Sequence, residues 1–247
     1  MFQIKQMQKT YDPSKWWWQK KKKNTSSIRF KNLDITSNSM TVIFGENGTG
    51  KTTLLNILGL MDYPIHNGDG ADVFYKRSEK EQLKYSELSE PKISSIRNKD
   101  FGFMFQHDHL IDRLTGWENI AIPYLLKYPN QSLNDAINRI KLLCYEVEFN
   151  DMLERKILDR SPSTYSGGQK QRTALLRALI HDPKVIFADE PFASVDLKVV
   201  AKIINTFNKK MEQGKTIITV VHDTYKERFS FNKNYAFTMQ DIKDYLV

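Results

Sequence analysis

The chain has 247 residues, which is enough for one large domain or two small ones with a sizeable core. Its 40% hydrophobic and 27% charged residues exclude a disordered chain, a collagen and a low-complexity repeat. A single cysteine, Cys144, excludes an intrachain disulfide and a cysteine-rich zinc site and fits a reducing compartment. The longest apolar run, residues 120–126, is far shorter than the roughly 20 residues that span a bilayer. Residues 1–10 alternate like a strand, so we expect no secretion signal there.

Positive charge is in excess, because 37 lysines and arginines face 29 acidic residues and give a net charge of +8. A basic chain favours anionic partners, and polyphosphate nucleotides, nucleic acid and an anionic membrane surface all fit that description. Part of the charge forms one block, in which three tryptophans are followed by four lysines: Trp16, Trp17, Trp18, Lys20, Lys21, Lys22 and Lys23.

The apolar pattern predicts an alternation of strands and helices. In chain order the first predicted elements are strands at 2–9, 28–35 and 40–44, a helix at 51–60, a charged segment with one helix at 76–100, a strand at 100–106, and helices within 117–155. The later ones are a helix at 169–181, a strand at 185–188, a helix at 197–212, a strand at 216–221, a short helix, and a strand at 235–238. Strands that alternate with helices predict βαβ units and a largely parallel sheet.

A glycine-rich loop lies between a predicted strand and a predicted helix and matches the pattern GxxxxGK[ST]. Its residues are Gly45, Glu46, Asn47, Gly48, Thr49, Gly50, Lys51 and Thr52. The glycines allow backbone N–H groups and the helix N-terminus to face phosphates, Lys51 neutralises the β- and γ-phosphate oxygens, and the Thr52 hydroxyl can bind Mg²⁺. The motif predicts a phosphate-binding loop, without deciding the kind of nucleotide enzyme.

Two carboxylates, Asp189 and Glu190, end the apolar strand at 185–188. In a parallel sheet that end is the edge where ligands bind. We expect Asp189 to hold Mg²⁺, directly or through water, and Glu190 to act as the general base that accepts a proton from the attacking water. Alone, such a pair is most often a helix cap or a solvated turn, and the phosphate-binding loop is what favours the catalytic interpretation.

The string Tyr165-Ser166-Gly167-Gly168-Gln169 resembles the LSGGQ signature of ATP-binding cassette (ABC) ATPases, and it lies 23 residues before Asp189, as in that family. The serine and glycines open a helix whose N–H groups can meet a γ-phosphate. The resemblance implies a head-to-tail homodimer, in which the signature of one copy closes the phosphate-binding loop of the other. It also implies an α/β P-loop NTPase with a mostly parallel core sheet, an antiparallel β subdomain and a helical insertion.

Further functional positions are implied by the resemblance. Gln106 resembles the Q-loop glutamine that touches Mg²⁺ and water, Asp196 resembles the D-loop aspartate, and His222 resembles the switch histidine. The implied catalytic residues are Glu190, His222, Gln106 and Lys51, and the implied metal ligands are Thr52, Gln106 and Asp189. The implied ATP contacts are Tyr11, Gly45, Glu46, Asn47, Gly48, Thr49, Gly50, Lys51, Thr52, Thr53, Ser166, Gly167, Gly168, Gln169 and Asp196.

Adenine stacking stays open between two candidates. The family stacks an aromatic residue on the base, and Tyr11 has the expected place, with one of Trp16, Trp17 or Trp18 as the alternative. The lysine block at 20–23 is expected to be a solvated hairpin tip, with an anionic membrane surface as the sharper alternative. His107 and His109 are not expected to bind zinc, and Cys144 is expected to be a core residue.

Two connecting strings, at 54–62 and 105–123, resemble the branch of the family that contains lipoprotein-releasing, macrolide-export and cell-division ATPases. Tyr165, Asp112 and Val195 depart from the usual residues of the family or branch without removing a catalytic group. We expect a single nucleotide-binding domain over 1–247, with a helical subdomain at about 107–180. It would hydrolyse ATP with Mg²⁺, dimerise, and power a separately encoded permease from the cytoplasmic face of the membrane, without specific nucleic-acid binding. The alternatives are a soluble ABC ATPase for iron–sulfur assembly or DNA work, and a P-loop kinase, which the signature disfavours.

Overall fold

The computed structural model describes residues 1–5, 7–11, 26–62, 72–106, 109–193, 195–225 and 235–245. Its centre is a parallel sheet with the strand order β11-β5-β10-β9-β8. These strands are β5 (Met40–Phe44), β8 (Phe101–Met104), β9 (Val185–Asp189), β10 (Thr216–Val221) and β11 (Tyr235–Thr238). Every residue of β5, β9 and β10 is buried, as expected for parallel strands that are covered on both faces.

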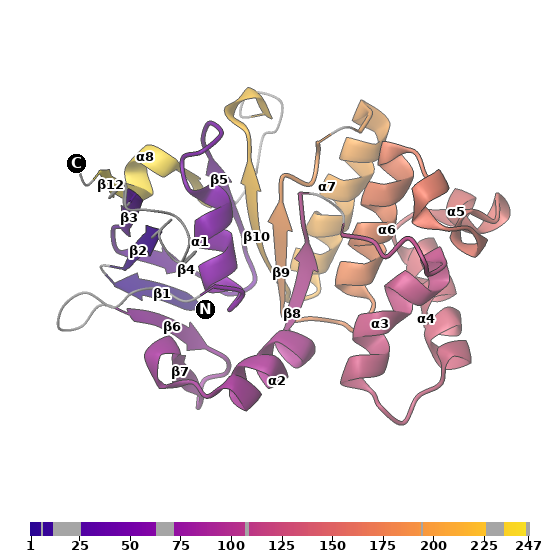
Figure 1. Ribbon diagram of the computed structural model, residues 1–247, viewed down its shortest axis with the longest axis horizontal. Helices are drawn as coiled ribbons and strands as arrows, with labels where there is room; N and C mark the ends of the chain where they lie inside the picture. Colours follow the sequence, from indigo (N-terminus) through magenta and orange to yellow (C-terminus); the bar gives the residue numbers. More distant parts are fainter. Residues whose placement is uncertain are drawn as a thin grey trace, which may run out of the picture.

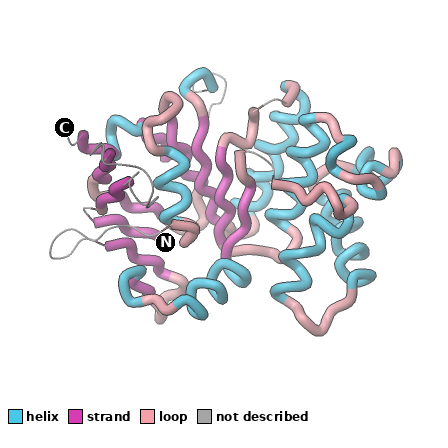
Figure 2. Tube along the Cα trace, in the orientation of Figure 1, coloured by secondary structure: helices cyan, strands magenta, loops and turns pink. Residues whose placement is uncertain are grey.

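Helices cover both faces of this sheet (Figures 1 and 2). Helix α1 (Lys51–Leu58) packs on β9 and β10 from one side, and α6 (Gly167–Leu179) and α7 (Leu197–Glu212) pack from the other. Helix α7 carries apolar residues at helical spacing and buries Val200, Ile203 and Phe207. The sheet therefore separates two cores, one shared with α1 and one shared with α6 and α7.

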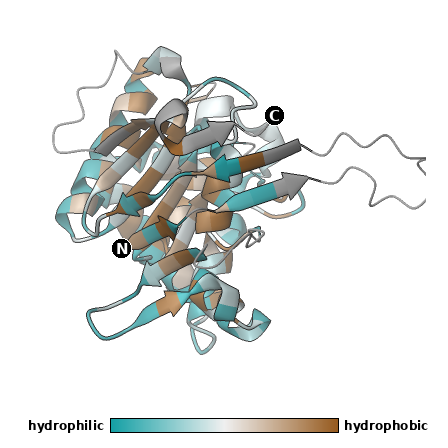
Figure 3. Ribbon diagram, turned by 90° about the vertical axis from the view of Figure 1, so that its left-hand side faces the viewer, coloured by the Kyte–Doolittle hydropathy of each residue, from teal (hydrophilic) through white to brown (hydrophobic). Residues whose placement is uncertain are grey.

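Two antiparallel sheets flank α1. One has the order β4-β1-β6-β7 and the other β12-β3-β2. Their strands are β1 (Phe2–Lys5), β2 (Gln8–Tyr11), β3 (Ser26–Phe30), β4 (Leu33–Ile35), β6 (Asp72–Lys76), β7 (Gln82–Lys84) and β12 (Lys243–Tyr245). Hydrophilic and hydrophobic residues mix along these strands (Figure 3), because one face packs on the core while the other does not.

The predicted antiparallel strands need correction. The range 2–9 is two strands in two different sheets, since β1 pairs with β4 and β6 whereas β2 pairs with β3. The range 28–35 is likewise divided between β3 and β4. The charged segment at 76–100 contains β7 and α2 (Glu90–Asp100), whereas β6, α8 (Met239–Ile242) and β12 were not predicted.

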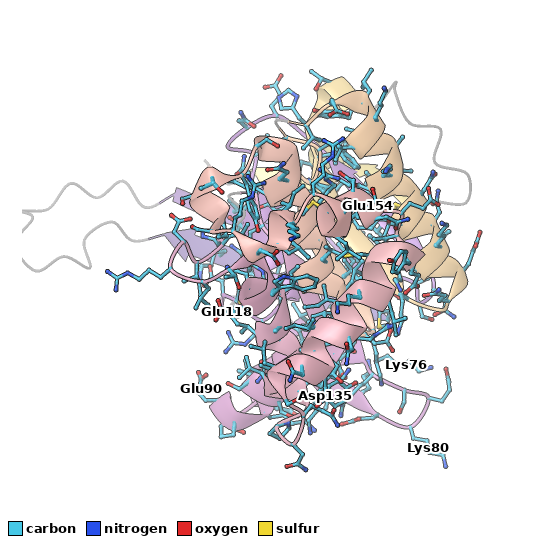
Figure 4. The ribbon with its side chains drawn as sticks, turned by 90° about the vertical axis from the view of Figure 1, so that its right-hand side faces the viewer. Lys76, Lys80, Glu90, Glu118, Asp135 and Glu154 are labelled. Carbon is cyan, nitrogen blue, oxygen red and sulfur yellow. The ribbon has the colours of Figure 1, made fainter. Side chains whose placement is uncertain are left out.

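A cluster of helices lies at one end of the molecule (Figure 1). Helix α3 (Gly116–Lys127) packs on α4 (Leu133–Glu146) and α6, and α5 (Asn150–Glu154) packs on α4. Helices α3 and α4 begin with capping boxes built on Thr115 with Glu118 and on Ser132 with Asp135. Figure 4 shows Asp135 and Glu154 at the surface of this end. The predicted helical periodicity at 117–155 is confirmed.

The core of the helical cluster contains Cys144, which is fully buried as predicted. Burial raises the pKa of its thiol to about 12, so the side chain behaves as a small apolar group. Among the helices of the described ranges, none combines the length and the apolar character that crossing a bilayer requires.

Candidate functional site

The glycine-rich loop at 45–50 joins β5 directly to α1. Gly48 and Gly50 have φ of +76° and +101°, which side chains rarely tolerate, and a Cβ on Gly50 would lie 2.8 Å from Ile28 Cδ1. The Thr49 hydroxyl donates to Glu46 O at 2.8 Å and closes the loop on itself. Gly50 is the N-cap of α1 and offers no side-chain cap, so the first N–H groups of the helix are available to an anion.

Lys51 lies inside this loop with only 5% of its side chain exposed. Its Nζ donates to Gly45 O at 2.7 Å and to Glu46 O at 2.9 Å. The same Nζ lies 3.6 Å from Glu190 Oε1. The loop thus wraps around a buried ammonium group, and the carboxylate that directly follows β9 balances its charge.

Glu190 connects three of the predicted motifs. It follows β9 with φ of +46°, and its N–H donates to Val220 O at 2.9 Å. Oxygen Oε1 faces Lys51, while Oε2 accepts from Gln106 Nε2 at 2.8 Å. Residues separated by 84 positions in the sequence therefore meet at one carboxylate, at the carboxyl edge of the parallel sheet.

The neighbouring positions share this edge. Asp189 is buried and pairs in register with Val220, and His222 directly follows β10, whose Val221 pairs with Phe44. At this edge the His222 Nδ1 lies 3.3 Å from Thr224 Oγ1. Among the described residues, no group of three His, Cys, Asp or Glu side chains gathers as it would in an all-protein metal site.

The signature residues begin α6. Ser166 is the N-cap, its Oγ accepts from Gln169 N at 3.3 Å, and its N–H donates to Gln169 Oε1 at 3.0 Å. Helix α6 lies across the sheet from α1 (Figure 1), so a single chain does not bring the start of α6 to the glycine-rich loop. Asp196 caps α7 by accepting from Val199 N at 3.0 Å.

Several of the predicted site residues, or their side chains, lie outside the part of the chain that the structure describes. Tyr11 lies at the end of β2, and its side chain is not described. The tryptophans at 16–18, the lysines at 20–23, His107, Asp108 and Ser194 lie outside the described residues. Adenine stacking and the interpretation of the two histidines therefore stay predictions.

Sequence reasoning missed Asn119, a fully buried residue of α3 that organises the loop before the helix. Its Oδ1 accepts from Ile111 N at 2.7 Å, and the two N–H groups of its Nδ2 are shared among Ile111 O, Leu114 O and Thr115 O, which lie at 3.1, 3.3 and 2.9 Å. One side chain thus fixes both ends of residues 111–115. The available signal was a polar amide inside the apolar stretch of this helix.

A groove of about 360 Å³ lies between α2, β8, α3 and α6. Aromatic rings of β8 and of the residue after it line the groove, together with two arginines. The lining residues include Arg97, Phe101, Phe103, Phe105, Pro123 and Arg177. No aspartate or glutamate lines the groove among the described residues. Arg177 Nη1 donates to His109 O at 2.7 Å, which ties α6 to the segment after Gln106.

Known proteins resemble this chain over most of its length. The ABC transporter family profile matches residues 29–193. An uncharacterized ABC transporter ATP-binding protein of Methanocaldococcus jannaschii, MJ0796, is 32% identical over 93% of this chain and 90% of its own length. The macrolide export ATP-binding/permease protein MacB of Chlorobium phaeobacteroides is 36% identical over 80% of this chain, which matches 28% of that protein.

Solved structures show the same likeness. The dimeric structure of MJ0796, a bacterial ABC transporter cassette, superposes with a TM-score of 0.78 at 30% identity and covers 97% of this chain and 95% of that one. A dimeric post-hydrolysis state of the same cassette bound to ADP and phosphate gives a TM-score of 0.78 over 100% and 99% of the two chains.

Proposed function

The chain belongs to the ABC transporter family of ATP-binding proteins, and from this premise we propose that it binds and hydrolyses ATP to power a separately encoded membrane permease. The relatives reported above are transporter proteins, which favours this function over a soluble ABC ATPase for iron–sulfur assembly or DNA work. We assign the whole chain to one nucleotide-binding domain, with a helical subdomain at about 107–180.

One observation carries the proposal: Glu190 is held between Lys51 and Gln106 at the carboxyl edge of the sheet. When ATP occupies the loop, its β- and γ-phosphate oxygens take over the ammonium group of Lys51. Glu190 is then free to accept the proton of the water that attacks the γ-phosphorus. A P–O bond to the new water oxygen forms, the bond to the ADP oxygen breaks, and phosphate leaves.

A magnesium ion fits the donors present. Thr52, Gln106 and Asp189 offer a hydroxyl, an amide and a carboxylate, and Mg²⁺ prefers oxygen ligands. Such ions are usually bound by one or two carboxylates together with substrate phosphates, so an all-protein cage is not required. We assign the ion to these three residues, and when bound it would neutralise charge on the phosphate oxygens.

Other contacts to the nucleotide follow the same assignment. His222 lies at the sheet edge beside the loop and is assigned to the γ-phosphate, and Tyr11 is assigned to the adenine, with the tryptophans at 16–18 as rivals. Residues 45–53 form the cradle of the phosphates. The net charge of +8 favours a polyphosphate ligand.

The site is completed by a second copy of this chain. Ser166, Gly167, Gly168 and Gln169 start α6 on the side of the sheet away from α1, so a partner's α6 would present their N–H groups to the γ-phosphate. Asp196 lies at the start of α7, where the two copies would cross. The dimeric state of the MJ0796 cassette supports this arrangement.

The permease would dock beside the nucleotide sensor. Residues 109–115 begin with His109, which contacts Phe105 and Arg177, two of the residues that line the groove. Apolar rings would give a permease helix its anchor, and Arg97 with Arg177 would orient it. The chain would then be cytoplasmic and peripheral on the inner face of the membrane.

Two experiments test this function. Trapping ATP in a Glu190→Gln variant should convert monomer to dimer in sedimentation, and adding Ser166→Arg should prevent it, because a long side chain replaces the N-cap that faces the partner's phosphate. A trapped variant that stays monomeric at saturating ATP would refute the nucleotide sandwich, that is, the head-to-tail dimer with ATP bound between the two copies.

The link to transport is tested separately. Wild-type protein purified from detergent-solubilised membranes should bring a membrane protein in near-stoichiometric amount. Recovery without one would replace transport with the soluble alternative.

A further inference from the structure

The residue directly before Ser166 is a tyrosine whose hydroxyl group is buried. We propose that Tyr165 is a positioning residue for the signature: its hydroxyl fixes Ser166 to the N-terminus of α3, in the geometry that meets the partner's γ-phosphate. The proposal rests on the proposed function, because it assigns a role within the same composite site.

The hydroxyl closes the chain segment that leads to the signature. Tyr165 is 7% exposed, and its Oη lies 2.8 Å from Ile157 O and 3.1 Å from Arg160 O. These carbonyls lie eight and five residues earlier, in the 3₁₀ turn Ile157–Asp159 and directly after it. The Tyr165 side chain therefore closes residues 157–165 into a loop, and Ser166 is the next residue in the chain.

The Arg160 carbonyl joins this loop to α3. It accepts the Gly116 N–H at 3.1 Å as well as the Tyr165 hydroxyl. Gly116 is the first residue of α3, and a Cβ there would clash with the Tyr165 hydroxyl and with the Leu158 backbone, so the close approach of the hydroxyl requires glycine at this position. The start of α3 and the approach to the signature thus meet at a single carbonyl oxygen.

Two further hydrogen bonds run between the same segments. Ser161 Oγ donates to Asp112 O at 2.7 Å, and Trp117 Nε1 donates to Asp159 Oδ1 at 2.6 Å. These two hydrogen bonds connect residues 112–117 to residues 159–161, which precede Ser166. These hydrogen bonds therefore connect the proposed permease-facing loop to the signature, and the Tyr165 hydroxyl is the link closest to Ser166 in the sequence.

A role for Tyr165 in apolar packing alone would not account for the position of its hydroxyl group. An aliphatic residue or a phenylalanine would fill the pocket but could donate no hydrogen bond to the two carbonyls. Burial raises the pKa of Tyr165 to about 12, so the hydroxyl keeps its proton and donates throughout the neutral range. The hydroxyl is therefore the part of the Tyr165 side chain that ties the approach to Ser166 to the carbonyls of Ile157 and Arg160.

Tyr165→Phe removes the hydroxyl and keeps the ring, and it is tested in the Glu190→Gln background. Two signatures act in each sandwich, and one hydrogen bond is worth about a fivefold change in an equilibrium constant. We expect the dissociation constant of the ATP-bound dimer to rise about 25-fold, by sedimentation at saturating ATP. Binding of a fluorescent ATP analogue to the monomer should not change. Tyr145→Phe, at an exposed position of α4, is the matched control and should change neither quantity.

A second readout needs no nucleotide. In the nucleotide-free protein, hydrogen exchange of the Gly116 and Ser166 amides should be faster in Tyr165→Phe than in wild type, since the closed loop opens more often. A merely structural role would lower the melting temperature and leave the ratio of dimer affinity to monomer ATP affinity unchanged. Dimer affinities of Tyr165→Phe and its parent within twofold would overturn the proposal and leave the sandwich intact. A parent that never dimerises would overturn both.

Discussion

Replacing Glu190 with glutamine should change ATP hydrolysis and ATP binding in opposite directions: hydrolysis should become slower and binding tighter. The amide matches the carboxylate in shape but accepts no proton, so the turnover number should fall by roughly 10² to 10⁴, the usual contribution of a general base. The amide also leaves Lys51 without its ionic partner in the empty site. Nucleotide then no longer competes with a carboxylate for that ammonium group, and its affinity should rise.

The geometry of the ion pair sets the size of the gain. At 3.6 Å the Coulomb attraction between unit charges is about 1 kcal/mol in water and about 5 kcal/mol at an effective dielectric constant of 20. Lys51 and Glu190 are 5% and 17% exposed, so the pair lies between these limits, and the cost of desolvating both charges offsets much of the attraction. We expect ATP to bind the monomer about tenfold more tightly in Glu190→Gln, which corresponds to about 1.4 kcal/mol.

The assay pairs two measurements on one preparation: phosphate release under saturating ATP, and titration with a fluorescent nucleotide at a protein concentration that keeps the chain monomeric. Glu154→Gln makes the same charge change at an exposed position of α5 and should alter neither result. A Glu190→Gln turnover within tenfold of wild type would refute the general-base role. Unchanged nucleotide affinity would refute the competition for Lys51.

Three predictions concern stability and can share one series of urea unfolding experiments. Burial lowers the pKa of His181 from 6.5 to about 4, so the unfolded chain binds more protons, and the free energy of unfolding should fall by up to about 3 kcal/mol between pH 6.5 and 4. His181→Gln should flatten that dependence, and an unchanged slope would contradict the assignment. Gly102→Ala places a Cβ against a backbone carbonyl of α6 and should cost about 1–3 kcal/mol, whereas Gly168→Ala, with its nearest contact at 3.7 Å, should not. Arg172 donates from Nη1 to both oxygens of Asp151 at 2.8 and 2.6 Å and from Nε to Gly168 O at 3.2 Å, so Arg172→Lys, which lacks the second donor nitrogen, should lose about 1 kcal/mol, and no loss would show that the Nε bond contributes nothing.

Local patterns predicted the central sheet well. The strands Met40–Phe44, Thr216–Val221 and Tyr235–Thr238 and the helix Leu197–Glu212 are observed with the predicted bounds, since a buried apolar run or a helical period is contained in the segment itself. The antiparallel strands were predicted less well. β1 pairs with β6, some seventy residues away, and no property of residues 2–9 indicates where one sheet ends and the next begins.

The same distinction holds for the site. Parallel topology predicts that a loop after β5 and carboxylates after β9 share one edge, and the contact of Gln106 with Glu190 agrees with it. The roles of these residues stay predictions. The ion pair of Lys51 with Glu190 and the contacts of Asn119 and Tyr165 were not predicted, because each depends on side-chain positions that no motif records.

The buried amide of Asn119 has a consequence for the speed and strength of docking. Because it holds the backbone of residues 111–115 at four points, this loop has little conformational entropy left to lose when a permease arrives. Recognition would then resemble the meeting of two preorganised surfaces, with association limited by orientation more than by folding of the loop. Force that a closing dimer applies to the permease would likewise pass through a stiff element, so little of the work of ATP hydrolysis would be lost in bending it.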